Sequence, residues 1–526
     1  MTNPTVPNRG LVVFSGGSAA NNLVDVFDSV RETKNCPLSY IIPISDNGGS
    51  SSELIRIFGG PGIGDVRSRL VRLIPESPPH SERAAIKTLF NHRLSADAVQ
   101  AHAEWYSIVD GTSTIWKLIT PAKKELIRSF FNLLNLEILK RARPPSSTFD
   151  FTSASVGNLF LTGARLFSGS FESAIYLLGS ICGVPSDLVR VIPAINSNFS
   201  HHISASLADG TIIVGQNSIS HPSEATALRP RSRRPSLLLA DGDGGSSSDG
   251  NSSDEGLLED TNNLHKQYQD YGDEDDHPPG SLPTLRNKNI SFSKSDNEDL
   301  PSRITRIWYI NPYGQEIRPP ANPRVIEALQ DAQAIVYSIG SLYTSLIPSL
   351  ILRGVGHAIA TGPARHKILV LNGSLDRETG PPSAAFTAVD FVEAITRAGE
   401  ESRGRNGGGA VDPDPAQAGD KDLHPSPLPY TSYVTHVLHL EGPGTPAVDK
   451  YRLAAMGIET LRLYGRKITS TGADGGEVAV GMKYDATALI QALEVVLGRK
   501  GDAMLRGGEN NGLSRRNTLD PGRKKT

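Results

Sequence analysis

The stretch that decides the fold is residues 45–70, SDNGGSSSELIRIFGGPGIGDVRSRL, which follows an apolar run at residues 40–44. The apolar run is typical of a buried strand, and residues 54–58 indicate a helix. The loop at residues 46–52 offers backbone N–H and hydroxyl groups with little side chain, which suits a phosphate group at the start of a helix. The stretch therefore predicts a strand, a phosphate-binding loop and a helix in succession.

The same order of strand, glycine-containing loop and helix recurs along the chain. We expect further strands at residues 11–14, 334–337 and 367–371, and helices at residues 22–30 and 122–142. Such repeats predict an α/β fold, a Rossmann-like and mostly parallel sheet with flanking helices. Because ligands bind at the carboxyl ends of the strands in these sheets, the glycine loops should meet at one edge.

Three loops supply the first candidate ligands for phosphate. Each combines glycine with hydroxyl groups, and none matches a G-x-x-x-x-G-K-[ST] or a full G-x-G-x-x-G motif. The candidate residues in these loops are Ser15, Gly16, Gly17, Ser18, Asn47, Gly48, Gly49, Ser50, Ser51, Gly340, Ser341, Tyr343 and Thr344.

Three segments differ from the rest in composition. They are acidic or rich in Ser and Gly, and they cannot bury enough apolar surface to offset their ordering entropy, so we predict disorder. The predicted parts are a first core part at 9–223 with a helical insertion at about 95–148, an acidic insert at 224–300, a second core part at 301–398, an insert at 399–428, a C-terminal core part at 429–498 and a tail at 499–526.

Overall composition excludes several classes of function. The chain has 53 Lys and Arg against 56 Asp and Glu, a net charge of −3, which argues against binding nucleic acid or anionic membranes through bulk charge. Its two cysteines, Cys36 and Cys182, form no CxxC motif and no disulfide scaffold. We see no signal peptide and no apolar run approaching the ~20 residues of a membrane span, and we expect a cytoplasmic location.

Long motifs carry a resemblance to a known family. The quoted stretch contains Asp46 to Ser51 and Pro61 to Ser68, where that family has roughly ADDGGSSG and PPGDIRN. Further motifs follow in the same order: SGGSAAN, LFNHRL, SVGNLFLTG, LADGTIIVGQ, ITRIWYINP, IGSLYTSLIPSLILRGV and KILVLNGSLDRETG. The sequence resembles the CofD-like family (UPF0052), which includes the 2-phospho-L-lactate transferases and the YvcK gluconeogenesis-factor proteins.

The resemblance implies a function. The transferases of the family move a phospholactyl group from a guanosine diphosphate carrier to a deazaflavin alcohol with Mg²⁺, so we expect a protein that binds a nucleotide diphosphate conjugate and acts as such a transferase. The alternative is a YvcK-like regulator of carbon or cell-wall metabolism that binds a nucleotide sugar without catalysis. A scaffold with a vestigial site is a third reading. The family also implies a homodimer.

The resemblance also assigns roles near the second loop. Asp46 and Asp65 are the expected catalytic carboxylates and Mg²⁺ ligands, because Mg²⁺ prefers one or two carboxylates with phosphate oxygens and water. The alternative for Asp65 is a helix N-cap. Arg67 is expected to bind phosphate, or to pair with Asp65 or Asp46. Asn158 is expected to face the same site, or to be an ordinary turn residue.

Other assignments lie near the third loop and farther along the chain. Ser341 and Thr344 are expected to contact phosphate or sugar, and Tyr343 either stacks on a ring of the ligand or packs in the core. Lys483 falls where the family has a basic residue, although a lysine ahead of a helix is commonly solvated. Its place in the family pattern makes Lys483 a candidate for nucleotide binding.

The sequence departs from the family pattern at positions that bear on which ligand the protein binds. The paired aspartates of the family loop are Asp46 and Asn47 here, so one carboxylate is missing, and a helical insertion follows Arg93. Separately, RRPSL and RRNTL fit the pattern of basophilic kinase sites, so Ser236 and Thr518 are candidate phosphorylation sites. These features lean toward regulation, whereas the nearly complete motif set leans toward a working site.

Overall fold

A computed structural model describes residues 9–17, 19–45, 48, 50–144, 147–221, 282, 299–404, 428–471 and 477–498. The candidate residues that lie outside these ranges are Ser18, Asp46, Asn47, Gly49, Ser236 and Thr518. The predicted inserts and the tail fall almost entirely outside them as well. One boundary differs from the prediction, because the helix at Ala388–Ser402 continues past the expected start of the second insert at residue 399.

The centre of the molecule is a seven-stranded sheet in which every neighbouring pair is parallel, in the order β11-β10-β9-β8-β1-β2-β3. The bounds are β1 (Gly10–Phe14), β2 (Leu38–Ile42), β3 (Val189–Pro193), β8 (Ala332–Tyr337), β9 (His366–Val370), β10 (His436–His439) and β11 (Glu459–Arg462). β1 is buried along its whole length, which explains why its sequence is continuously apolar and does not alternate.

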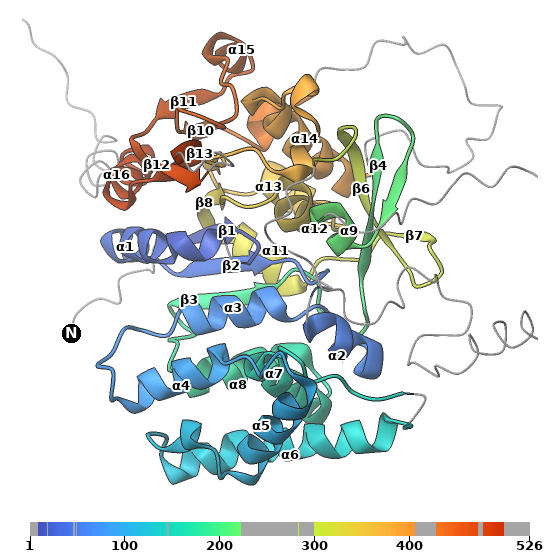
Figure 1. Cartoon of the computed structure of the whole chain (residues 1–526). Coiled ribbons are helices and arrows are strands. Elements are labelled where there is room, and N and C mark those ends of the chain that lie inside the picture. The colour runs from blue at the N-terminus through green and yellow to red at the C-terminus, as the bar shows by residue number, and fades with distance from the viewer. Residues whose placement is uncertain are drawn as a thin grey trace, which may run out of the picture.

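The other strands form two smaller sheets, neither of which was predicted. The first is antiparallel in the order β5-β4-β6-β7, and the second is the hairpin of β12 and β13. Their bounds are β4 (His202–Leu207), β5 (Ile212–Val214), β6 (Ile304–Ile310), β7 (Glu316–Ile317), β12 (Gly465–Thr471) and β13 (Glu477–Tyr484). Figure 1 shows β4, β6 and β7 standing beside the central sheet, next to α12.

Helices cover both faces of the central sheet. α1 contacts β2 and α3 contacts β3, whereas α11 contacts β1, β3 and β8. The helical bounds are η1 (Ala20–Leu23), α1 (Val24–Lys34), α2 (Ser50–Phe58), α3 (Gly64–Arg72), α4 (Glu82–Asn91), α5 (Ala98–Asp110), η2 (Thr114–Trp116), α6 (Pro121–Arg141), α7 (Val156–Ser168), α8 (Phe171–Cys182), α9 (Gln216–Ser220), α11 (Pro323–Gln330), η4 (Leu342–Leu346), α12 (Ile347–Leu350), α13 (Val355–Thr361), η5 (Arg377–Thr379), η6 (Pro382–Ala384), α14 (Ala388–Ser402), η7 (Tyr430–Ser432), α15 (Lys450–Ala455) and α16 (Ala486–Val496).

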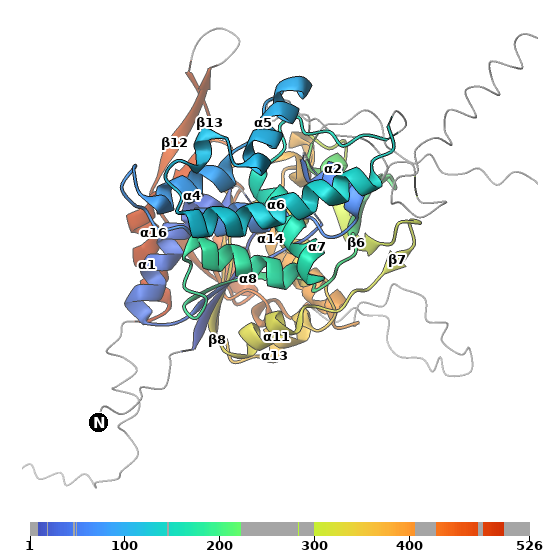
Figure 2. The ribbon, with the colours of Figure 1, turned by 90° about the horizontal axis from the view of Figure 1, so that it is seen from below.

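The predicted helical insertion forms part of an additional layer. α4 to α8 lie together below α3 in Figure 1, and α6 and α8 are in front when the molecule is seen from below (Figure 2). Trp105 on α5 and Phe131 on α6 are fully buried, and their rings meet edge to face. α6 matches the helix predicted at residues 122–142. The Rossmann-like α/β fold with flanking helices is therefore confirmed.

Candidate functional site

The order of strands places a switch point between β1 and β8. From β1 the chain continues to β2 and β3 on one side, whereas from β8 it continues to β9, β10 and β11 on the other. At such a point the loops that follow the two central strands diverge, and a ligand can approach the carboxyl edge between them. The loops after Phe14 and Tyr337 thus lie at the position where doubly wound sheets bind their ligands.

The loop after β1 touches both α3 and the loop after β8. A Cβ atom added to Gly16 would lie 2.4 Å from Ser345 Oγ, and one added to Gly17 would lie 2.0 Å from Asp65 Oδ1. Both glycines therefore approach a neighbouring segment closely, and a side chain at either position would displace its neighbour. The prediction that distant glycine-containing loops gather at one edge is confirmed for the described parts of the first and third loops.

The second loop is connected to α3 by Asn158, a residue at the beginning of α7. Asn158 is 3 % exposed, and its Nδ2 donates to Ser50 Oγ at 3.1 Å. Its Oδ1 accepts a hydrogen bond from Arg67 Nε at 3.2 Å. Asn158 lies in the first turn of α7, behind the N-cap Ser155, so the alternative of an ordinary turn residue is wrong. It connects the start of α2 to α3.

Asp65 and Arg67 both lie on α3 and are partly exposed. The N-cap of α3 is Ile63, so the alternative that Asp65 caps this helix is wrong, and Asp65 occupies the first turn instead. A carboxylate there interacts favourably with the helix dipole. Arg67 donates from Nη1 to Asn91 Oδ1 at 3.5 Å in addition to its bond with Asn158.

The third loop surrounds the carboxyl group of a buried glutamate. Glu378 is 1 % exposed, and its Oε2 accepts hydrogen bonds from the backbone N–H of Tyr343 at 2.9 Å and of Thr344 at 3.1 Å. Its Oε1 accepts from the hydroxyl groups of Thr344 and of Ser220, the latter at 3.1 Å. The Glu378 carboxylate occupies the place at the start of η4 where a phosphate was expected.

Tyr343 and Thr344 consequently have internal partners in place of the predicted ligand contacts. Tyr343 is 6 % exposed, donates its hydroxyl to the Ile304 carbonyl at 3.0 Å and meets Phe386 edge to face. The core-packing alternative for Tyr343 is thus supported. Thr344 is buried beside Glu378. Ser341 is partly exposed, and its hydroxyl bonds to Asp376.

The segment after β9 holds the third loop in place. Asn372 Oδ1 accepts from the Gly340 N–H, and Asn372 Nδ2 donates to the Gly340 carbonyl, each at 2.9 Å. Burial raises the pKa of Glu378 to about 8, and the neighbouring Asp376 adds to the rise. Burial likewise raises the pKa of Asp376. Asn372, Asp376 and Glu378 belong to the family motif LNGSLDRETG but were not among the predicted site residues. The signal in the sequence was a pair of carboxyl groups in the loop that follows a strand.

The exposure of the candidates separates two groups. The partly exposed ones, which can face a ligand, are Gly17, Gly48, Ser50, Asp65, Arg67, Gly340 and Ser341. The buried ones support the loops and include Ser15, Gly16, Ser51, Asn158, Tyr343 and Thr344. Lys483 is exposed on β13, opposite Arg466 of β12, as the solvated alternative expects.

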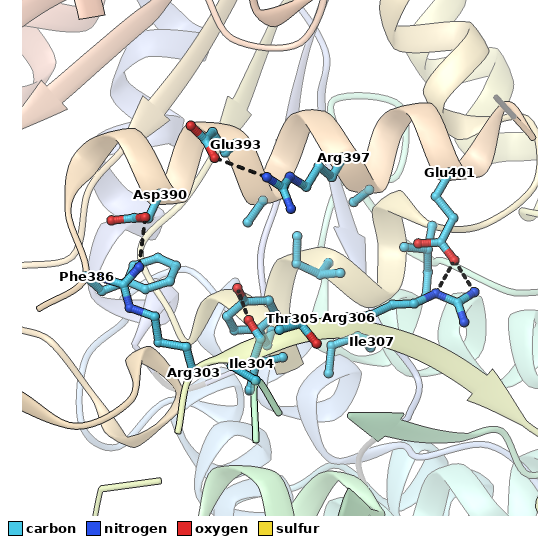
Figure 3. A pocket seen from close by; sticks show the side chains of 16 residues that line it. Arg303, Ile304, Thr305, Arg306, Ile307, Phe386, Asp390, Glu393, Arg397 and Glu401 are labelled. Atoms are coloured by element: carbon cyan, nitrogen blue, oxygen red, sulfur yellow. Dashed lines mark hydrogen bonds and ion pairs between the residues drawn. The ribbon is translucent and has the colours of Figure 1, made fainter. Parts of the chain in front are cut away.

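A separate pocket of about 310 Å³ lies between β6 and α14 (Figure 3). Its charged side chains are paired with one another: Arg303 with Asp390 at 3.0 Å, Arg306 with Glu401 at 2.5 Å, and, within α14, Arg397 with Glu393 at 3.4 Å. These pairs neutralise one another, so the pocket lacks the excess positive charge that a phosphorylated ligand would favour.

Comparison with known proteins agrees with the geometry. A family described as 2-phospho-L-lactate transferase CofD matches residues 11–415. The chain belongs to the CofD family. A Saccharomyces cerevisiae protein named as uncharacterized is 44 % identical over 393 residues, covering 74 % of this chain and 83 % of its own.

More distant CofD-type relatives extend the comparison. The gluconeogenesis factor of Halalkalibacterium halodurans is 21 % identical over 463 residues, which cover 87 % of this chain and 89 % of that protein. A crystal structure of a Bacillus halodurans protein aligns over 93 % of this chain and 100 % of its own, with a TM-score of 0.50 and 18 % identity. That structure shows a shared fold for this member of the CofD family.

Two features are absent from the described ranges of this CofD-family chain. No group of three or more His, Cys, Asp or Glu side chains there could hold a metal ion. No helix of the described ranges has the length and hydropathy of a bilayer-crossing span.

Proposed function

We propose that this CofD-family chain binds a nucleotide diphosphate conjugate where its glycine loops meet, and transfers a phospholactyl-type group from a guanosine diphosphate carrier to an alcohol. The observation that supports the proposal is the contact of Gly17 with Asp65 and of Gly16 with Ser345 at the switch point of the sheet. Two loops and the first turn of α3 there combine close backbone approach with an acidic side chain, as phosphoryl-type transfer requires.

Mg²⁺ fits the side chains at this junction. Asp65 offers one half-exposed carboxylate beside the first loop, and we propose Asp46 as the second. A three-residue cluster is not needed, because Mg²⁺ takes one or two carboxylates and completes its shell with phosphate oxygens and water. When bound, the ion would neutralise charge on the phosphate oxygens.

The protein's own groups would orient the conjugate. The partly exposed guanidinium of Arg67, whose Nε is held by Asn158, would contact a phosphate oxygen. Backbone N–H groups at Gly17 and Gly48 would donate to phosphate oxygens at close range because glycine lacks a side chain. The Glu378 carboxylate would leave phosphate to the first two loops, because it occupies the start of η4.

A nucleotide panel tests the proposal. Thermal shift against guanosine and uridine nucleotides and their sugar conjugates, with and without Mg²⁺, should show stabilisation by guanosine diphosphate that needs Mg²⁺. A ligand at 100 times its Kd adds about 2.7 kcal/mol to the free energy of unfolding. Asp46→Ala and Asp65→Asn should lose the Mg²⁺-dependent part. Asp25→Asn, a surface aspartate in the first turn of α1, should retain it.

A second candidate function rests on the names of the relatives. The proteins of Halalkalibacterium halodurans and Bacillus subtilis that resemble this chain are named gluconeogenesis factor. The corresponding proposal is a regulator that binds a nucleotide sugar without catalysis. Stabilisation by a uridine sugar with no Mg²⁺ effect would favour this regulator, and stabilisation by no nucleotide would contradict both proposals.

A further inference from the structure

A buried arginine lies directly beneath the first glycine loop. Arg69 on α3 is 0 % exposed, and its Nη2 donates to the Gly16 carbonyl at 3.2 Å and to Ser15 Oγ at 3.3 Å. Its guanidinium stands 4.4 Å from the centre of the Tyr40 ring on β2. Arg69 therefore connects α3, β2 and the loop after β1 from the inside.

The charge of Arg69 is poorly compensated. Among the described residues, no carboxylate oxygen lies within the 4.0 Å of an ion pair with it, and its Nε and Nη1 have no hydrogen-bond partner. Burial lowers the pKa of Arg69, and Tyr40 and, to a smaller extent, Asp65 oppose this. An arginine stays protonated in proteins, so a full positive charge remains inside. A buried charge without a close counter-ion is costly and calls for a reason.

We propose that Arg69 is a positioning residue that supplies a fixed positive charge to the phosphate site, with a diphosphate group as the anion that completes its neutralisation. The inference rests on the proposed function and names a residue that the function did not include. The bond from Nη2 to the Gly16 carbonyl engages this acceptor from the buried side of the loop, and the bond to Ser15 Oγ holds the preceding residue. Because the intervening space is protein and not water, the attraction is weakly screened.

Variants of Arg69 can be compared with a matched control. Arg165 on α7 is also buried, at 8 % exposed, and donates to the carbonyl of Gly59 at 2.9 Å. Burial lowers the pKa of Arg165 to about 10. Arg165→Met thus also removes a buried arginine that donates to a loop carbonyl, but that carbonyl belongs to Gly59 and not to the first glycine loop. Arg69→Met removes the charge and both hydrogen bonds, whereas Arg69→Lys keeps the charge but loses the forked geometry of the guanidinium group.

The experiment is calorimetric titration of the full chain with inorganic phosphate and with pyrophosphate, below the unfolding temperature of every variant. Arg69→Met should weaken pyrophosphate binding by about tenfold or more, or 1.4 kcal/mol. The loss should be smaller for phosphate, which carries less charge. Arg69→Lys should recover part of the affinity, and Arg165→Met should match the wild-type chain.

The outcomes separate this inference from the proposed function. Equal pyrophosphate affinity in the wild-type chain and in Arg69→Met would overturn the role of Arg69 and leave the proposed function in place. Equal losses for both anions, with no recovery in Arg69→Lys, would show a structural role only and would also overturn it. A wild-type chain that binds neither anion would overturn this inference, whereas the proposed function fails only if no nucleotide conjugate stabilises the chain.

Discussion

Replacement of Gly17 by alanine should strongly weaken nucleotide binding with little effect on stability. The added Cβ would lie 2.0 Å from Asp65 Oδ1 and 2.9 Å from its Cγ, so the carboxylate has to move. Because the obstacle is the end of a side chain, the fold can accommodate the change. The loop, however, loses its acidic neighbour and its close approach to the ligand. We expect the Kd for guanosine diphosphate with Mg²⁺ to rise by about 100-fold or more, or 2.7 kcal/mol.

A control and a double variant make the Gly17 prediction specific. Gly179 in α8 has only one neighbouring atom near its added Cβ, at 3.9 Å, so Gly179→Ala should bind as the wild-type chain does. If the effect of Gly17→Ala acts through Asp65, the alanine should cost less in an Asp65→Ala background, because the two changes share one contact. Undiminished affinity in Gly17→Ala would contradict the assignment of the first loop to the ligand.

The second large effect concerns Glu378 and pH. Its pKa in the folded protein is about 8, above the ordinary value of 4.5, because the carboxyl is buried and lies near Asp376. Between about pH 5 and pH 8 the folded chain therefore holds a proton that the unfolded chain has released. Stability should fall as pH rises through this window, by up to about 1.4 kcal/mol per pH unit. The contribution is fully present below the unfolded pKa and is lost above about pH 8.

Glu378→Gln should remove this pH dependence, because the amide has no proton to release. Chemical denaturation at several pH values should show the free energy of unfolding of the variant rising relative to that of the wild-type chain from pH 5 to pH 8. Above pH 8 the difference between the two should stay constant. In Ser220→Ala the carboxyl loses a donor that favours its ionised form, so the decline should extend to higher pH. A difference between Glu378→Gln and the wild-type chain that is constant across the whole range would contradict the prediction.

Much of the fold could be predicted because its signals are local. Continuous apolar runs marked β1, β2, β8 and β9, since strands covered on both faces have no polar side to show. Because these apolar runs alternate with segments of helical spacing, the sequence predicted a parallel sheet. The spacing of apolar residues likewise predicted α6. In the antiparallel sheet of β4 to β7, the pairing of β4 with β6 could not be predicted because a long insert separates the two strands, whereas the pairings of β4 with β5 and of β6 with β7 are local.

The candidate site was predictable only in part. Gly16 and Gly17 were found from composition, since glycine after a strand indicates close approach. The role of Glu378 was not found, because nothing in its neighbours along the chain shows that it reaches the N–H groups of Tyr343 and Thr344. Those two residues looked like ligand contacts from the same local pattern.

The sequence by itself determined the α/β architecture, the family and the glycine loops, because periodicity, turn chemistry and long motifs are properties of neighbouring residues. The tertiary structure decided which groups can face a ligand and which form hydrogen bonds to other parts of the protein. It placed a carboxylate at the third loop and a buried cation, Arg69, beneath the first. The physical reason is that hydrogen-bond partners and burial depend on segments that meet only after folding, and no local pattern records them.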